Sequence, residues 1–160
     1  MDHFQSIPPE RRAEPFVKWA GGKKRMLSVY DSLFPSHFET YHEPFLGGGA
    51  VFLFLAHVER ISSALLSDSN AELIHLYRVV RDDVEHLIEE LAEYPYENDF
   101  YYSLRATNPM DLEPVKRAAR MLYLNRTCFN GLYRVNRKGQ FNVPIGRYDR
   151  PVICNAANLR

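Results

Sequence analysis

The sequence has few cysteines and no long apolar run, and these two absences exclude several classes of protein. Its only cysteines, Cys128 and Cys154, are too few for a disulfide framework or a zinc site. No stretch approaches the ~20 consecutive apolar residues that a membrane-spanning helix needs. We therefore expect free thiols in a reducing cytoplasm, and neither a membrane anchor nor a bound metal ion.

The first residues also lack the apolar segment of a secretory signal. Residues 1–15 are largely polar and carry Pro8 and Pro9, which predicts a flexible leader. The whole chain is 46% hydrophobic, 25% charged and 13% aromatic, a composition that is typical of a globular protein. Its 160 residues suffice for a hydrophobic core of ordinary domain size.

The formal net charge is zero, but the charges are unevenly divided along the chain. Residues 116–150 hold nine basic residues and one acid, which gives +8, while the remaining residues hold 11 basic and 19 acidic residues, which gives −8. A basic segment on an otherwise acidic chain favours the binding of a polyanion at one face. A solvated charged face without a partner is the alternative that charge alone leaves open.

The first part of the chain has the pattern of an α/β protein. Residues 26–34 have helical spacing and end at Pro35. Residues 40–45 predict a short strand that runs into three glycines, and residues 50–57 are apolar enough for a buried helix. Residues 63–67 predict a second strand, followed by polar residues that can cap a helix beginning near residue 71. Together these segments form one βαβ unit.

The rest of the chain is mainly helical. The spacing over residues 73–91 predicts two helices or one broken helix, residues 100–105 a shorter piece, and residues 114–125 a longer helix. Two short segments, 133–135 and 141–143, then flank a basic, glycine-containing turn, which predicts a β-hairpin. Asn155 can cap a last helix that ends near residue 160.

The glycines after the first strand predict a ligand-binding loop, because glycine has no Cβ to collide with a ligand. Asp68 lies about 20 residues further on, at the end of the second strand, where a carboxylate can bind ribose hydroxyls. Phe52 stands where a dinucleotide-binding loop has its third glycine, which disfavours NAD and FAD and favours a nucleoside such as S-adenosylmethionine. A simple tight turn, with Asp68 as a helix cap, remains an alternative. Trp19 is either a core residue or the cover of an aromatic ligand.

Five segments, taken in order, resemble the blocks of the Dam-like DNA adenine-N6 methyltransferases, the alpha group of the D12 class. They are residues 18–23, 43–49, 67–70, 130–134 and 140–148. The resemblance implies the N-terminal part of a Rossmann-like methyltransferase sheet, with an inserted target-recognition domain made of helices and a β-hairpin. After the leader, it divides the chain into half of a cofactor domain at 16–75, the target-recognition domain at 76–150, and a return to the catalytic domain at 151–160.

The resemblance also implies two sets of binding residues. S-adenosylmethionine would be contacted by Trp19, Lys23, Glu43, Phe45 and Asp68, with Gly47 and Gly49 beside its methionine portion. Bases would lie near Lys18, Asn130, Arg134 and Pro144, with Phe129 placed to wedge into the stack. Arginine can pair with guanine, asparagine with adenine, and proline or leucine can meet a thymine methyl group. The other residues that we expect near double-stranded DNA are Leu132, Asn142, Arg126, Arg137, Lys138 and Arg147, with Arg117 and Arg120 as further candidates for phosphate contacts.

The family's catalytic motif, Asp-Pro-Pro-Tyr, has no counterpart in this sequence. The only Pro-Pro pair is Pro8-Pro9, which lies between Ile7 and Glu10. We therefore expect an N-terminal fragment of a methyltransferase specific for a GATC-like site, which would serve either a restriction-modification system or regulation. It would have no catalytic residues of its own, would be inactive alone, and would take the missing C-terminal half as a partner in trans. The alternatives are a non-catalytic DNA-binding module and, on the glycine loop alone, a nicotinamide or flavin oxidoreductase.

Overall fold

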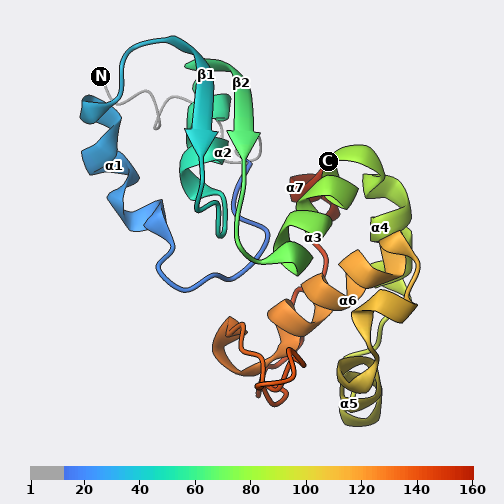
Figure 1. Ribbon diagram of the computed structural model, residues 1–160. Coiled ribbons are helices and arrows are strands. Elements are labelled where there is room, and N and C mark those ends of the chain that lie inside the picture. Colours follow the sequence, from blue (N-terminus) through green and yellow to red (C-terminus); the bar gives the residue numbers. More distant parts are fainter. Residues whose placement is uncertain (1–12) are drawn as a thin grey trace. The chain divides into compact units, whose positions relative to one another are not determined.

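The computed structural model describes residues 13–160, which divide into two compact units (Figure 1). Of the described residues, the first unit holds 13–16 and Gly21–Ser69, and the second holds Val17–Ala20 and Asn70–Arg160. The predicted leader at residues 1–15 lies mostly outside the described residues. The predicted start of a target-recognition domain at residue 76 falls inside a helix and stays a prediction.

Over residues 23–33 the first unit forms three short helical turns instead of the single predicted helix. They are η3 (Lys23–Met26), α1 (Leu27–Tyr30) and η4 (Asp31–Leu33), with 3₁₀ geometry in the first and last. Phe34 then turns to extended backbone (ψ 146°). The residue before a proline disfavours helical backbone, so the predicted end of the helix at Pro35 is confirmed.

Two parallel strands and a helix follow, as the βαβ pattern predicts (Figure 1). Strand β1 (Phe38–Glu43) pairs with β2 (Ile61–Leu66) in a register that runs from Phe38 opposite Ile61 to Glu43 opposite Leu66. Both strands begin two residues earlier than predicted, whereas α2 (Ala50–His57) has the predicted bounds. The core of the unit is apolar and consists of Leu27, Val51, Phe54 and Leu55, with Phe34, Phe38, Tyr41, Val58 and Ile61 packed around them.

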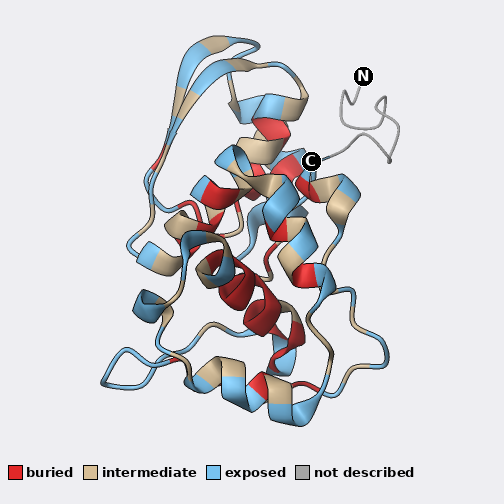
Figure 2. Cartoon of the chain, turned by 90° about the vertical axis from the view of Figure 1, so that its right-hand side faces the viewer, coloured by how far each residue is buried: buried red, intermediate tan, exposed pale blue. Residues whose placement is uncertain are grey.

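The second unit is built on one central helix, α6 (Pro114–Thr127). Residues 118–125 of this helix are all buried, which is the pattern of a helix covered on every side (Figure 2). Three helices pack against it: α3 (Ala71–Asp82), α4 (Val84–Ala92) and α5 (Asn98–Ala106). The break at Asp83 confirms two helices over residues 73–91, and Pro114 lies in the first turn of α6 as predicted. A single 3₁₀ turn, η5 (Pro109–Asp111), lies between α5 and α6.

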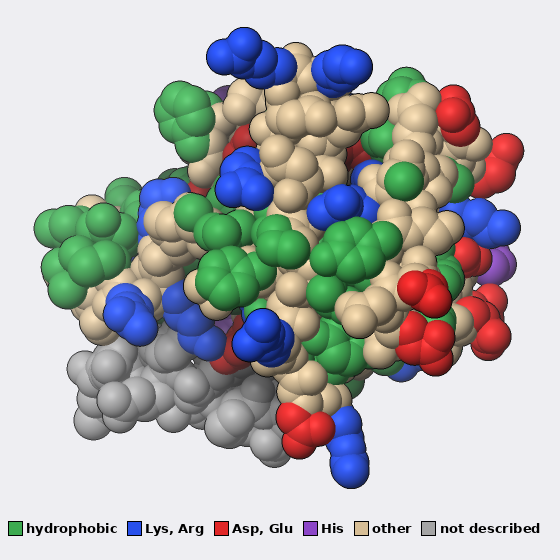
Figure 3. All heavy atoms as spheres, turned by 90° about the horizontal axis from the view of Figure 1, so that it is seen from below, with side chains coloured by type: hydrophobic (Ala, Val, Ile, Leu, Met, Phe, Trp, Pro, Cys, Tyr) green, Lys and Arg blue, Asp and Glu red, His purple; other side chains and the backbone are tan. Residues whose placement is uncertain are grey.

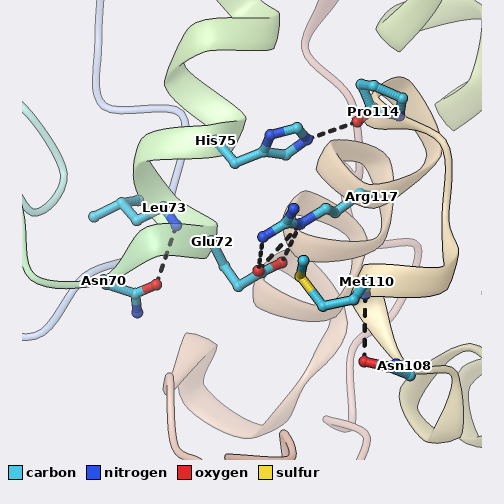
Figure 4. A network of polar contacts seen from close by, with 8 residues as sticks. All are labelled: Asn70, Glu72, Leu73, His75, Asn108, Met110, Pro114 and Arg117. Atoms are coloured by element: carbon cyan, nitrogen blue, oxygen red, sulfur yellow. Dashed lines mark hydrogen bonds and ion pairs between the residues drawn. The ribbon is translucent and has the colours of Figure 1, made fainter.

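Polar contacts fix α3 to α6 (Figure 4). The guanidinium of Arg117 binds both carboxylate oxygens of Glu72, with Nε at 3.1 and 3.2 Å from them. The ring Nε2 of His75 lies 2.8 Å from the carbonyl oxygen of Pro114. Because Arg117 and Glu72 are largely buried, their ion pair is shielded from solvent and acts as a structural link.

The predicted hairpin exists, but without two regular strands. A single antiparallel bridge joins Val135 to Phe141, and the N–H of Asn136 donates to the carbonyl of Gln140 at 2.8 Å. The side chain of Asn136 accepts from the backbone N–H groups of Lys138 and Gln140, at 2.9 and 3.0 Å. Side-chain bonds of this kind replace part of a strand ladder, which explains why the pairing stops after one bridge.

A second bridge, between Cys128 and Ile145, closes the same segment beside the 3₁₀ turn η6 (Phe129–Gly131). The last helix, α7 (Ala156–Leu159), is capped by Asn155 as predicted, with its side chain accepting from the N–H of Asn158 at 3.2 Å. Within residues 13–160, no helix is both long enough and apolar enough to cross a membrane.

Candidate functional site

The glycine loop links the ends of the two strands. Gly47 and Gly49 have φ angles of +52° and +68°, which glycine adopts without strain. The N–H of Gly47 donates to Oδ2 of Asp68 at 2.9 Å, and the N–H of Leu46 donates to the carbonyl of Ser67 at 3.0 Å. The helix after β2 is capped by Asn70, whose side chain accepts from Leu73. Asp68 therefore supports the loop, and its alternative reading as the helix cap is wrong.

A pocket of about 440 Å³ opens beside this loop. Three of the residues predicted to contact the cofactor, Lys23, Glu43 and Phe45, line it together. Its volume is within the range of small-molecule sites, and its walls are mostly apolar, as is usual for such sites. The ring of Phe45 is 76% exposed, so its face is accessible from solvent. The other lining residues are Tyr30, Leu33, Phe34, Tyr41, His42, Pro44 and Val51.

Glu43 is the acidic residue that lines this pocket. It is only 6% exposed, and its Oε2 accepts the backbone N–H of Phe52 at 3.2 Å. Burial raises the pKa of the Glu43 carboxyl, while Lys23 and the hydrogen bonds from Tyr41 and Phe52 act in the opposite direction. Burial and the neighbouring Glu43 raise the pKa of Tyr41. The backbone of Phe52, which replaces the third glycine of a dinucleotide loop, thus anchors a carboxylate.

Trp19 belongs to the second unit, unlike the rest of the predicted cofactor residues. Its ring packs on Tyr133, with ring centroids 5.3 Å apart and planes tilted by 31°. Tyr133 in turn contacts Phe141 edge-on at 5.7 Å. Trp19 is therefore joined to the hairpin segment by an aromatic row, and its expected contact with a cofactor stays a prediction.

Apart from Lys18, the residues predicted to read bases come from two segments that the structure brings together. The N–H of Phe129 donates to the carbonyl of Pro144 at 2.9 Å, and Arg134 Nε donates to Oδ1 of Asn142 at 2.7 Å. Phe129 and Leu132 are 50% and 41% exposed although both are large and apolar. The other members of this surface that are exposed are Asn130, Arg134 and Pro144.

Lys18 lies beside these segments. Its ammonium Nζ donates to the hydroxyl of Tyr148 at 3.2 Å and sits 4.4 Å from the centre of that ring. Gly131, with φ +62°, packs so closely that a Cβ at this position would lie 2.3 Å from Cδ of Lys18. The glycine of the resembling block is therefore favoured here by contact with the lysine as well as by backbone conformation.

Sequence reasoning missed Asn125, the polar residue that holds Lys18. Its Oδ1 accepts the N–H of Lys18 at 2.7 Å, and its Nδ2 donates to the carbonyls of Lys18 and Gly131 at 2.8 and 3.2 Å. It is 1% exposed. The signal in the sequence was a polar residue among the apolar positions of α6, four positions after Met121. A buried amide without hydrogen-bond partners would destabilise the fold there.

The basic residues divide into exposed and structural ones. Arg137, Lys138 and Arg147 are exposed, as phosphate contacts must be, whereas Arg126 donates to the carbonyl of Val152 at 3.0 Å. One face of the molecule carries Lys and Arg side chains beside hydrophobic ones (Figure 3). The prediction of a phosphate contact is wrong for Arg120.

Arg120 is 5% exposed and donates to the carbonyls of Leu104 and Arg105 at 2.9 and 2.8 Å. These carbonyls lie in the last turn of α5, where they have no partner within the helix. Burial lowers the pKa of Arg120. Arg117, bound to Glu72, is likewise structural.

Comparison with known proteins places these features in one family. The family model described as D12 class N6 adenine-specific DNA methyltransferase matches residues 19–160. The chain is 43% identical over 164 aligned residues to the type II methyltransferase M.MjaIII of Methanocaldococcus jannaschii, covering 92% of this chain and 57% of that protein. It is 46% identical to M1.LlaDCHI of Lactococcus lactis subsp. cremoris, covering 88% and 50%. It is 41% identical to the DNA adenine methylase of Haemophilus influenzae, covering 90% and 51%.

The chain belongs to the D12 class N6 adenine-specific DNA methyltransferases, because the family model matches most of its length. The resemblance drawn from the five sequence blocks is thereby confirmed. The chain spans about half the length of the curated relatives it matches. The small parallel sheet and its helix agree with part of a methyltransferase fold, and family membership argues against the oxidoreductase alternative. A family of methyltransferases implies the use of S-adenosylmethionine.

Proposed function

We propose that this chain supplies the cofactor-binding and DNA-recognition parts of a Rossmann-like, S-adenosylmethionine-dependent methyltransferase that modifies adenine N6 in a GATC-like site of double-stranded DNA. The observation that carries the proposal is the pocket beside the glycine loop, where Lys23, Glu43 and Phe45 meet within a chain of this family. The names of its relatives, type II methyltransferases and DNA adenine methylases, support the same reaction class.

The donor set of the pocket fits the proposed cofactor. S-adenosylmethionine is a cation with an adenosine moiety and a transferable methyl group. Glu43 offers a buried carboxylate and Phe45 an exposed aromatic face. Asp68 is not among the residues that line the pocket, but its carboxylate at the second strand end is bound to the glycine loop, in the position expected for ribose hydroxyls. The left-handed glycines keep Cβ atoms away from the loop surface, so a ligand can approach the backbone.

Methyl transfer to an adenine requires the base to leave the duplex and to be held by acceptors for its amino hydrogens. In the resembling family this is the task of Asp-Pro-Pro-Tyr, which the 160 residues do not contain. The chain by itself would therefore bind cofactor and DNA without transferring a methyl group. A polypeptide that carries the motif, added in trans, would restore transfer.

Equilibrium dialysis of the 160-residue chain against radiolabelled S-adenosylmethionine tests the cofactor site, and a filter assay with the same label and a GATC duplex tests transfer. We expect binding that Asp68→Ala abolishes, and no label in DNA. Label in the DNA contradicts the inactivity of the chain alone. DNA binding without any cofactor binding favours the alternative of a non-catalytic DNA-binding module, which the exposed basic residues of the hairpin also support.

A further inference from the structure

Residues 143–148, called here the reading segment, are held by side chains for which no DNA contact is predicted. The hydroxyl of Tyr101 donates to the carbonyl of Val143 at 2.9 Å, and Nη1 of Arg105 donates to the same oxygen at 3.2 Å. Tyr101 and Arg105 are four residues apart in α5, so they lie on one face of that helix. All of these residues belong to the second unit. One helix of this unit therefore fixes the start of the reading segment.

Both donors act on the amide that joins Val143 to Pro144. A proline nitrogen carries no hydrogen, so the carbonyl oxygen of Val143 is the only hydrogen-bonding group of this amide. The peptide group is planar, so the ring nitrogen, Cα and Cδ of Pro144 lie in the plane of that carbonyl. A donor that fixes the oxygen therefore also fixes the orientation of the proline ring.

Burial distinguishes the two sides of this amide. Tyr101 is fully buried and Val143 is 1% exposed, whereas Pro144 is exposed. Burial raises the pKa of Tyr101, so its hydroxyl keeps its proton and donates it. Because water does not compete for this buried bond, the bond is stronger than it would be on the surface. The exposed proline ring is thus oriented by a hydrogen bond that is shielded from solvent.

Other hydrogen bonds hold the rest of the reading segment. The hydroxyl of Tyr96 donates to the carbonyl of Gly146 and accepts the N–H of Tyr148 at 3.1 Å. The carbonyl of Pro144 accepts the N–H of Phe129 at 2.9 Å. The proline therefore lies between two fixed peptide groups, and a change at the first of them should tilt the ring without releasing the segment.

We propose that Tyr101 is a positioning residue for base recognition, which orients Pro144 through the Val143 carbonyl so that the proline ring meets the methyl group of a thymine. This rests on the proposed function, because it takes the ligand to be a GATC-like duplex and Pro144 to lie near its bases. The thymine methyl lies in the major groove, where an apolar side chain can contact it. Uracil lacks only this methyl group and pairs with adenine in the same way, so uracil measures the contact.

The test compares two affinities of the whole 160-residue chain. Fluorescence anisotropy gives the affinity for a labelled GATC duplex and for the same duplex with uracil in place of both thymines of the site. We expect the wild type to bind the thymine duplex about fourfold more tightly, the effect of burying one methyl-sized group. In Tyr101→Phe this thymine/uracil ratio should fall toward one. A loss of folded protein would change both affinities alike, so the ratio reports on positioning and not on stability.

Tyr123→Phe is the matched control. Tyr123 is also a fully buried tyrosine, and its ring centroid lies 6.2 Å from that of Tyr101. Its hydroxyl, however, donates to the carbonyl of Pro95 at 2.8 Å, outside the reading segment. This variant should lose a buried hydrogen bond of the same kind and keep the wild-type ratio. An equal fall of the ratio in both variants would overturn the inference.

The remaining outcomes separate the two proposals. A wild-type chain with no preference for GATC over a scrambled duplex overturns the site-specific part of the proposed function and this inference with it. A preference for GATC with a thymine/uracil ratio near one, or an unchanged ratio in Tyr101→Phe, overturns the inference alone. If Tyr101→Phe does not fold by circular dichroism, Arg105→Leu removes the other donor to the Val143 carbonyl and must lower the ratio. An unchanged ratio there also overturns the inference.

Discussion

The carboxylate of Asp68 accepts the backbone N–H of Gly47 at 2.9 Å, across 21 residues of sequence. The carboxyl end of one strand is thereby bound to the glycine loop that follows the other. Parallel strands place their carboxyl ends at the same edge of a sheet, and in open α/β sheets this edge is where ligands bind. Asp68 therefore combines support for the loop with the position expected of a ribose-binding group.

Asp68→Asn separates these two roles. The amide oxygen can still accept the N–H of Gly47, so the midpoint of urea unfolding should move little. Loss of the charge should weaken S-adenosylmethionine binding about tenfold or more, as is usual for a charged hydrogen bond to a ligand. Asp68→Ala should lose both the affinity and about 1 kcal/mol of stability. Equal affinity of the Asn variant and the wild type in dialysis contradicts a ribose contact.

Gly49→Ala should destabilise the first unit. Gly49 has φ +68° at the start of α2, and a left-handed alanine costs about 1–2 kcal/mol. Gly48, which is not among the glycines with positive φ, is the adjacent control, and Gly48→Ala should cost clearly less. Urea denaturation of the two variants gives the comparison. A smaller loss for Gly49→Ala than for Gly48→Ala contradicts the loop conformation.

Glu43→Gln should alter how stability depends on pH. Burial raises the pKa of Glu43, so the folded chain keeps this proton to a higher pH than the unfolded chain does. The stability that this proton contributes is fully present below the pKa of Glu43 in the unfolded chain. It is lost as the pH rises through the pKa of Glu43 in the folded chain. Glutamine stays neutral and can still accept from Phe52. The variant should therefore gain in thermal unfolding temperature over the wild type at pH 8 but not at pH 4, while binding cofactor more weakly.

Arg120→Met should lower the stability of the chain, whereas Arg137→Ala should weaken DNA binding. Removing Arg120 leaves the carbonyls of Leu104 and Arg105 without their donors and should cost about 2 kcal/mol or more in unfolding free energy. Removing the exposed Arg137 should change stability by less than about 0.5 kcal/mol. If Arg137 neutralises a phosphate, its loss should weaken binding equally for all DNA sequences. It should also lower the slope of the logarithm of affinity against the logarithm of salt concentration by about one. An unchanged salt slope would falsify the contact.

The two thiols should react at very different rates. Cys128 is fully buried, and burial raises its pKa to about 11. Cys154 is only partly buried, although burial raises its pKa as well. Titration of the native chain with Ellman's reagent at pH 8 should release one equivalent, and Cys154→Ser should react only after denaturant is added. Fast reaction of the Cys154→Ser variant contradicts the burial of Cys128.

The elements that sequence alone predicted well are those whose signals are local. The bounds of α2 follow from a glycine with left-handed backbone before Ala50 and an unbroken apolar run, and the start of α3 follows from Asn70, which caps it. The three cofactor residues that share a pocket were found through the family resemblance, since no spacing rule joins Lys23 to Glu43 and Phe45.

The features that escaped sequence reasoning depend on distant partners. Asn125 and Lys18 are 107 residues apart, so neither signals the other in the sequence. The burial of Arg120 depends on two carbonyls at the end of α5, which no charge count includes. The hairpin has a single bridge because the side chain of Asn136 binds its own turn, an outcome that strand propensity does not measure.

The placement of Val17–Ala20 in the second unit bears on how such proteins could be recombined. A chimera that exchanges only residues 70–160 with a relative would leave Lys18 and Trp19 of one parent against Asn125, Gly131 and Tyr133 of the other. A functional exchange of DNA specificity must therefore move two separate segments, a tetrapeptide near the N-terminus and the chain from Asn70 onward. Changes in the two segments should accordingly compensate each other among naturally diverged relatives.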